Sequence, residues 1–243
     1  MKIRVIAQNT FKEAIRDRIL YLLFFFAAVA LAFSRLLAVL TVGDRVKIIK
    51  DVGLASISIF GVLMAILIGT GLVYKEIDKK TIYTLLSKPI ERWQFLLGKF
   101  FGLVLTLFIM TLAMSGIFLA ILFLHTGKLE GRMLLAILFI FIELALITAV
   151  AILFSCFSTP ILSSIFSLSF FLIGHLSWGL EALLQKTRPG AGRTALRGLA
   201  AILPDLENFN FKTEVVHGLT IDPRYTLFIL ALAVLIFKKR DFV

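Results

Sequence analysis

Long apolar runs alternate with short polar segments along this chain. A helix that crosses the hydrocarbon core of a bilayer needs about 20 apolar residues. Five runs reach this length and predict spans at Ile19–Val42, Val52–Tyr74, Phe100–Leu124, Met133–Phe157 and Ile161–Leu184. A sixth run, Tyr225–Phe237, is short and reaches a plausible length only if it extends back to Ile221. The pattern therefore predicts six membrane spans, the last at residues 221–237.

Residues 1–18 carry a different pattern from the spans that follow them. Charged residues lie largely on one side of a helical projection, and apolar residues recur at helical spacing on the other, at Ile3, Ile6, Ala7, Phe11, Ala14 and Ile15. Such a segment is typical of an amphipathic helix that lies in the membrane interface. An unstructured basic flank is the alternative.

Composition supports the same class of protein. The chain has 243 residues, of which 60% are hydrophobic, more than a soluble domain of this size can hide from water. We predict an all-α integral membrane protein built as a single transmembrane domain over residues 1–243. The net charge is +11, and the basic residues lie between apolar runs rather than along one face. This distribution favours lipid headgroups over nucleic acid as the partner. A single cysteine excludes an intrachain disulfide.

The distribution of Lys and Arg predicts the orientation of the chain in the cell membrane. With the N-terminus inside, 14 of these residues face the cytoplasm and 12 face outward, so the rule favours cytoplasmic N- and C-termini by a narrow margin. Six of the 12 lie between Leu184 and Tyr225. We interpret residues 185–220 as an outer loop of short surface helices, with a re-entrant segment as the alternative.

The polar segment Tyr74–Phe101 lies between two predicted spans and holds six Lys and Arg residues. Within it, Thr81–Ser87 is compatible with a short helix, and Pro89 ends that helix because the residue before a proline avoids the helical region. Arg92, Trp93 and Lys99 follow at the expected membrane edge. The segment predicts a short helix presented to the cytoplasm, where a protein partner can bind it.

The order of residues in this segment resembles the permease subunits of the type-2 family of ATP-binding-cassette transporters. The matching residues are Glu76, Thr81, Leu85-Leu86-Ser87, Pro89-Ile90, Arg92 and Gly98-Lys99. Three further stretches agree, namely Asn9–Ala14 with Arg16 and Arg18, Leu203-Pro204 to Phe209-Asn210, and Phe237–Phe242. The resemblance covers nearly the whole chain. It departs from the family after Arg224, where the apolar stretch is shorter than expected.

The resemblance implies six spans behind an interfacial helix, both termini in the cytoplasm, and residues 75–99 as a cytoplasmic coupling loop. In that family the loop docks on a separate ATPase subunit, and two permeases, identical or different, assemble with two ATPases. Carried over by position, the ATPase-coupling residues are Glu76, Thr81, Leu85, Leu86, Pro89 and Arg92. The resemblance implies a transport subunit of the inner membrane that works as an exporter, whose energy source lies on another chain.

The sequence offers little bond-making chemistry. Gly190–Thr194 lacks the spacing and the lysine of a phosphate-binding loop, so we expect no cofactor in this chain and assign no catalytic residue. No metal site is expected either, because the three histidines and the one cysteine lie in separate segments. Glu143 and His175 are the polar residues of interest inside the spans. They are candidates for the translocation path, or for neutral hydrogen bonds between helices, and the sequence does not show whether they face each other.

Small residues repeat every four positions at Gly61, Ala65 and Gly69, and again at Gly98 and Gly102. Such spacing lets two helix backbones approach closely, either within the chain or between two copies.

The leading hypothesis for function is an ATP-driven transport permease. The alternatives are an ion-coupled secondary carrier or small membrane enzyme that uses Glu143 and His175, and a membrane anchor without transport. The transported substrate stays open.

Overall fold

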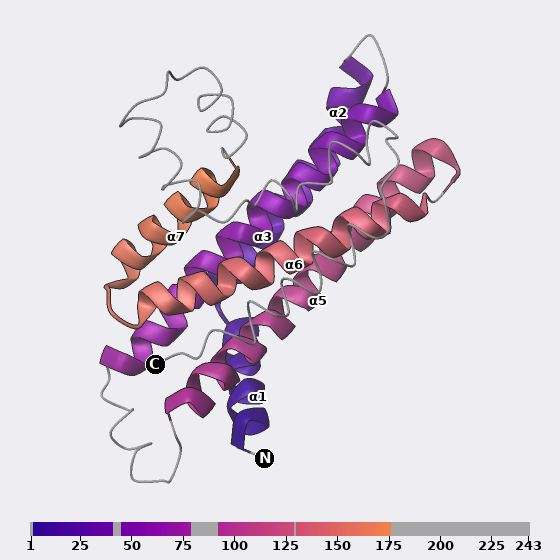
Figure 1. Cartoon of the computed structure of the whole chain (residues 1–243). Coiled ribbons are helices and arrows are strands. Elements are labelled where there is room, and N and C mark those ends of the chain that lie inside the picture. Colours follow the sequence, from indigo (N-terminus) through magenta and orange to yellow (C-terminus); the bar gives the residue numbers. More distant parts are fainter. Residues whose placement is uncertain (1, 41–44, 79–91, 129, 176–243) are drawn as a thin grey trace, which may run out of the picture.

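Residues 2–40, 45–78, 92–128 and 130–175 are described by a computed structural model of the chain (Figure 1). Every regular element within these ranges is a helix, which confirms the predicted all-α class. The helices are α1 (Lys2–Ile15), α2 (Arg18–Leu40), α3 (Arg45–Asp78), α5 (Arg92–Thr126), α6 (Gly131–Ser155) and α7 (Pro160–His175). The predicted outer loop at 185–220 and the sixth span at 221–237 lie outside the described residues, so six spans stays a prediction.

The helices α2, α3, α5 and α6 are each long and apolar enough to cross a membrane. They run alongside one another, and α7 lies beside α3 and α6 (Figure 1). α3 and α5 are much longer than their predicted spans, with 34 and 35 residues, because each continues as a helix into its polar flanks. The described part of α7 ends at His175, inside the predicted span 161–184.

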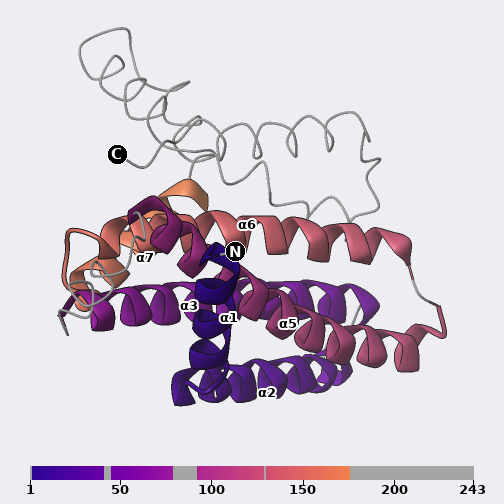
Figure 2. The same ribbon diagram turned by 90° about the horizontal axis from the view of Figure 1, so that it is seen from below.

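The amphipathic segment at the N-terminus forms α1, which lies across the direction of the long helices (Figure 2). A helix is therefore present where an unstructured flank was the alternative. α1 ends at Ile15, and the Oδ1 atom of Asp17 accepts a hydrogen bond from the backbone N–H of Ile19 at 2.9 Å. A side-chain acceptor of this kind satisfies a free N–H at a helix start, so Asp17 caps α2 and separates it from α1.

Local sequence also explains the two tight turns of the bundle. Gly127 follows α5 with a φ of +66°, a conformation that favours glycine, and its N–H donates to the carbonyl of Phe123 at 2.8 Å. α7 begins at Pro160, whose fixed φ suits the first position of a helix. The carbonyl of Thr159 accepts the N–H of Ser163 at 2.8 Å. These turns place α6 antiparallel to both α5 and α7.

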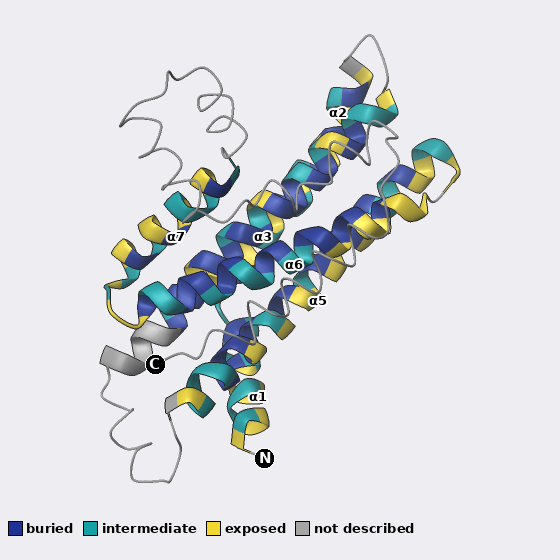
Figure 3. Ribbon diagram, viewed as in Figure 1, coloured by how far each residue is buried: buried dark blue, intermediate teal, exposed yellow. Residues whose placement is uncertain are grey.

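α3 is the centre of the bundle and contacts α2, α5, α6 and α7. Of its most apolar stretch 67% is buried, against 22% for α2, whose outer side is exposed (Figure 3). Close packing depends on Gly61 and Gly69: a Cβ atom on Gly61 would lie 2.7 Å from a methyl carbon of Leu144, and one on Gly69 would lie 3.4 Å from Ala151. Both neighbours belong to α6, so these small residues of α3 serve packing within the chain.

Candidate functional site

The predicted coupling residues lie around a break in the described structure. Thr81, Leu85, Leu86 and Pro89 are outside the described residues. Glu76 belongs to the last turns of α3 and Arg92 is the first residue of α5, but their side chains are also not described. Because α3 and α5 pack against each other, the predicted coupling segment joins two neighbouring long helices. The contacts of these six residues stay predictions.

The start of α5 packs closely against α1. A Cβ atom on Gly98 would lie 2.6 Å from the Cβ and Cγ2 atoms of Ile6, and one on Gly102 would lie 2.6 Å from the carbonyl oxygen of Ala7 and from the Cβ atom of Thr10. Real Cβ atoms essentially never approach so closely. Gly98 and Gly102 therefore make room for α1. The helix that packs on them is thus neither another span nor part of a second copy of the chain.

Lys99 lies between these two glycines and is 1% exposed. The sequence predicted Lys99 at the membrane edge, where a lysine can reach toward the headgroups, but in the structure α1 covers its side chain. The Nζ atom lies 3.6 Å from Oε2 of Glu13 in α1 and 5.9 Å from the ring centroid of Phe95. An opposite charge and an aromatic face offset part of the loss of hydration that burial imposes on the ammonium group. Lys99 thus ties α5 to α1.

Glu143 and His175 are brought together by the packing of α7 against α6. The Oε1 atom of Glu143 lies 3.5 Å from Nε2 of His175. The Glu143 side chain is 1% exposed, whereas that of His175 is 21% exposed. The ring of His175 also packs on Phe171, with centroids 4.5 Å apart. The sequence identified both residues, but the helix rotation that makes them face each other came only from the structure.

This pair lies deep in the bundle. Glu143 is the middle residue of the 25-residue α6, so it lies about 18 Å along the helix axis from either end. His175 lies about 22 Å along α7 from Pro160, at a similar depth. Two hydroxyls of the same helices are engaged within their own helix, since Thr148 donates to the carbonyl of Leu144 and Ser167 to that of Ser163. Burying a charged carboxylate in such apolar surroundings is costly unless a partner compensates it.

A second polar contact joins α3, α6 and α7 nearer the end where α3 meets the predicted coupling segment. The hydroxyls of Thr70 and Ser164 lie 3.0 Å apart, and the hydroxyl of Ser155 donates to the carbonyl of Thr70 at 3.2 Å. Hydroxyl hydrogen bonds between helices add to van der Waals packing within a membrane. Sequence reasoning missed this contact, and the only available signal was the presence of Ser and Thr within apolar stretches.

At the opposite end of the bundle, an ion pair joins α3 to the residue just before α6. Lys50 near the start of α3 donates to both carboxylate oxygens of Glu130 at 2.8 Å, just before α6 begins. The Lys50 side chain is 10% exposed and that of Glu130 is 44% exposed. The sequence placed Lys50 among the outer charges that set orientation and gave no sign of its partner. The contact fixes α3 to the turn between α5 and α6.

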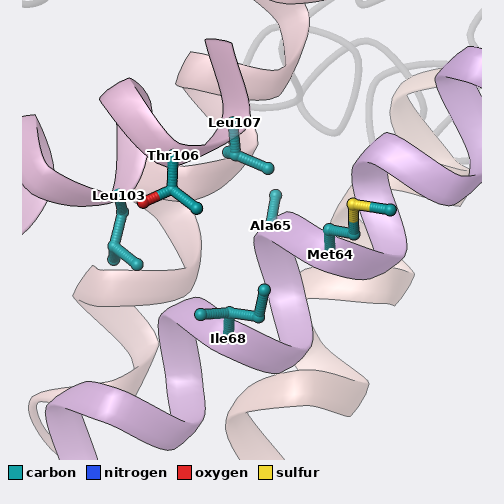
Figure 4. A pocket seen from close by; sticks show the side chains of 6 residues that line it. All are labelled: Met64, Ala65, Ile68, Leu103, Thr106 and Leu107. Carbon is teal, nitrogen blue, oxygen red and sulfur yellow. The ribbon is translucent and has the colours of Figure 1, made fainter. Parts of the chain in front are cut away.

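Between these polar contacts, the interface of α3 and α5 is apolar. Figure 4 shows a narrow gap there, lined by Met64, Ala65, Ile68, Leu103, Thr106 and Leu107. The one hydroxyl in the set, that of Thr106, donates to the carbonyl of Gly102 in its own helix at 2.9 Å. The gap therefore presents methyl and methylene groups, and it is a packing feature between two helices rather than a polar binding site.

Comparison with known proteins agrees with this architecture. A family model described as "ABC-2 family transporter protein" matches residues 4–242, nearly the whole chain. A search of the curated proteins finds no match. The matched range includes α1, the long helices, the predicted coupling segment and the part of the chain after His175. The chain therefore belongs to the ABC-2 family of transporter proteins and is a multi-pass membrane component of a transporter.

Proposed function

We propose that this chain is the membrane-spanning permease subunit of an ATP-driven exporter, and that residues 79–91 couple ATP hydrolysis on a separate subunit to movement of the spans. The observation that carries the proposal is the family match over residues 4–242. The family implies a partner ATP-binding-cassette subunit. In this proposal the chain provides the translocation path and transmits movement to it, and the partner subunit hydrolyses ATP.

The arrangement of the described helices supports this role for the segment. It connects α3 and α5, two continuous helices of 34 and 35 residues, each about 50 Å long. A displacement at the segment would be carried along both helices into the membrane because helices are stiff. α5 packs closely on α1, and Lys99 of α5 lies against Glu13 of α1. Because of these contacts, α1 would move together with α5.

Orientation and assembly belong to the same proposal. A partner ATPase in the cytoplasm requires residues 79–91 on that side, and with them the N-terminus and the turn between α6 and α7. The count of 14 Lys and Arg residues against 12 favours this orientation. We further propose that two permeases pair, either as two copies of this chain or with a related one.

A second candidate function is favoured by the contact between Glu143 and His175. An ionisable residue inside a membrane span is by default a candidate for the translocation path. With an imidazole 3.5 Å from a buried carboxylate, this pair resembles what an ion-coupled carrier requires. Both functions can use these residues in the translocation path. They differ in whether ATP or an ion gradient supplies the energy.

The experiment is co-purification of the tagged chain with a soluble ATPase. Leu85→Glu and Leu86→Glu should abolish capture, because a charge replaces an apolar contact at the predicted interface. Leu124→Glu is the matched control: Leu124 is 73% exposed, at the far end of α5. Its variant should capture as much ATPase as the unchanged chain. Absence of any ATPase, or equal capture by all three variants, would reject coupling through this segment and favour the carrier.

A further inference from the structure

The charged residues of the N-terminal segment separate by sign. Its two carboxylates are used within the protein: Oε2 of Glu13 lies 3.6 Å from Nζ of the buried Lys99, and Oδ1 of Asp17 accepts the backbone N–H of Ile19. Between residues 2 and 19, every charged residue that is exposed is a cation. We use the name basic face for four of these cations, Arg4, Lys12, Arg16 and Arg18.

The basic face has no counter-charge in the described part of the chain. Arg4 and Lys12 are eight residues apart on α1, little more than two turns, so they lie on one side of it about 12 Å apart along the axis. Arg16 and Arg18 follow at the junction with α2. No ion pair joins any of these four side chains to a described residue. Positive charge is thus concentrated on a surface that the described residues do not neutralise.

The exposed residues around the basic face place it at the level of the lipid headgroups. Directly after Arg18, the exposed side of α2 begins with Ile19 and Tyr21, which are 44% and 53% exposed. In a membrane span such apolar side chains face hydrocarbon, and tyrosine and tryptophan favour its edge. Trp93, 47% exposed in the first turn of α5, marks the same edge on the helix that α1 packs against. α1 runs across the direction of both helices at this edge (Figure 2), where the phosphate groups of lipids lie.

We propose that the basic face binds the headgroups of anionic phospholipids, such as phosphatidylglycerol, and that these lipids hold α1 in the plane of the membrane. Arginine and lysine bind phosphate oxygens through charge-assisted hydrogen bonds, and their long side chains reach headgroups from a helix at the interface. Each such residue near an anionic surface contributes about fivefold in affinity. Since α1 packs on Gly98 and Gly102, lipid bound to its outer side also secures the start of α5.

An anionic lipid fits the basic face better than an acidic protein does. Exposed apolar residues of a span follow Arg18 at once, so a soluble protein could not reach this end of the face without displacing lipid. The proposed contact with an ATPase is at residues 79–91, a different segment. The lipid site goes beyond the proposed function and is measured on the chain alone. A failure to capture an ATPase would therefore leave it standing, and its own failure would leave the coupling proposal standing.

The first test is native mass spectrometry of the full chain, released from micelles that contain equal amounts of phosphatidylglycerol and phosphatidylcholine. The unchanged chain should retain phosphatidylglycerol in excess. The triple variant Arg4→Gln, Lys12→Gln, Arg16→Gln removes three cations, so the ratio of phosphatidylglycerol to phosphatidylcholine that it retains should fall by about fivefold or more. An equal ratio in the unchanged chain and in this variant would refute the site.

The matched control removes the same charge from the other end of the bundle. Arg35, Arg45 and Lys128 are exposed there, and each is changed to Gln in a second triple variant. Exposed carboxylates of Asp51 and Glu130 lie at that end, so its cations are not alone on their surface. This variant should retain the two lipids in the same ratio as the unchanged chain. An equal fall in both triple variants would show an effect of net charge and would overturn a site on α1.

A second measurement follows α1 itself. Hydrogen exchange of residues 2–15 in phosphatidylcholine nanodiscs should slow when phosphatidylglycerol is included. The slowing should be lost in the first triple variant and kept in Arg4→Lys with Arg16→Lys, which preserves the charge. Equal exchange of the unchanged chain in both lipids would refute the claim that anionic lipid holds α1. If an ATPase protects residues 2–15 in pure phosphatidylcholine while phosphatidylglycerol has no effect, the basic face is a protein contact and the lipid site is refuted.

Discussion

The close packing of α5 on α1 predicts that Gly102→Ala destabilises the protein, although alanine favours helices. In an exposed helix the same change would stabilise by about 1 kcal/mol. At Gly102 the new methyl group would lie 2.6 Å from the carbonyl oxygen of Ala7 and 2.6 Å from the Cβ atom of Thr10. Both obstacles are on or next to the backbone of α1, so neither can rotate away, and the helix must shift as a whole.

Gly116 supplies a control on the same helix. A Cβ atom there meets nothing within 4 Å, so Gly116→Ala gains helix propensity without a clash. The propensity gain is shared by the two variants and cancels in their difference. Forcing an extra methyl group into a packed site costs about 1–3 kcal/mol. The free energy of unfolding of Gly102→Ala should therefore be lower than that of Gly116→Ala by about 1–3 kcal/mol.

The assay is reversible unfolding in mixed micelles, combined with limited trypsin digestion at Lys12 and Arg16. Both side chains are already exposed, so cleavage is limited by the helical backbone; displacement of α1 should free that backbone and speed cleavage in Gly102→Ala, and digestion of Gly116→Ala should be unchanged. Equal unfolding free energies for the two variants would show that α1 is not held against α5 in this way. A lower stability without faster cleavage would place the cost elsewhere than in α1.

Three further predictions concern the polar contacts and the single cysteine. Lys50→Ala and Glu130→Gln should each lower the free energy of unfolding by about 1 kcal/mol, since Glu130 is partly exposed and screened, and a double-mutant cycle should return a coupling of similar size. A cycle that returns no coupling would contradict the pairing. Thr70→Val should cost about 0.6 kcal/mol of unfolding free energy through its lost contact with Ser164, and equal stability would show the bond to be without net value. Cys156 is exposed at the turn after α6, yet its apolar surroundings raise the pKa of the thiol by desolvation, so reaction with an impermeant maleimide should accelerate as the pH rises. With cytoplasmic termini it should react in inverted vesicles and not in intact cells, and the reverse result would overturn the orientation.

Hydropathy predicted which stretches of the described chain form long helices but not how far each helix extends. α3 was expected to span Val52–Tyr74, and it runs from Arg45 to Asp78. A hydropathy scale measures the length that suits lipid, whereas a helix continues into water as long as its residues allow it. Lys50 illustrates the difference, because its place on a helical extension is what lets it reach Glu130.

The candidate site was predictable in its residue types and not in its contacts. A carboxylate inside a span is rare enough to identify Glu143 from sequence alone. Whether it faces His175 depends on the rotation and register of α7 against α6, which side-chain packing sets and periodicity does not. The same reason explains why the burial of Lys99 was not predicted: the sequence does not show that α1 packs over it.

The polar contacts join five of the six described helices into two groups. Lys99 and the glycines beside it hold α5 on α1, while Thr70, Ser155 and Ser164 hold α3 on α6 and α7. The gap where α3 meets α5 is lined by apolar groups, which do not fix one register as a directional hydrogen bond does. A force on residues 79–91 acts on both groups at once, since that segment joins α3 to α5. The six residues that line this gap form no hydrogen bond between α3 and α5 that a relative movement would have to break, and the site at Glu143 and His175 belongs to the group that contains α3.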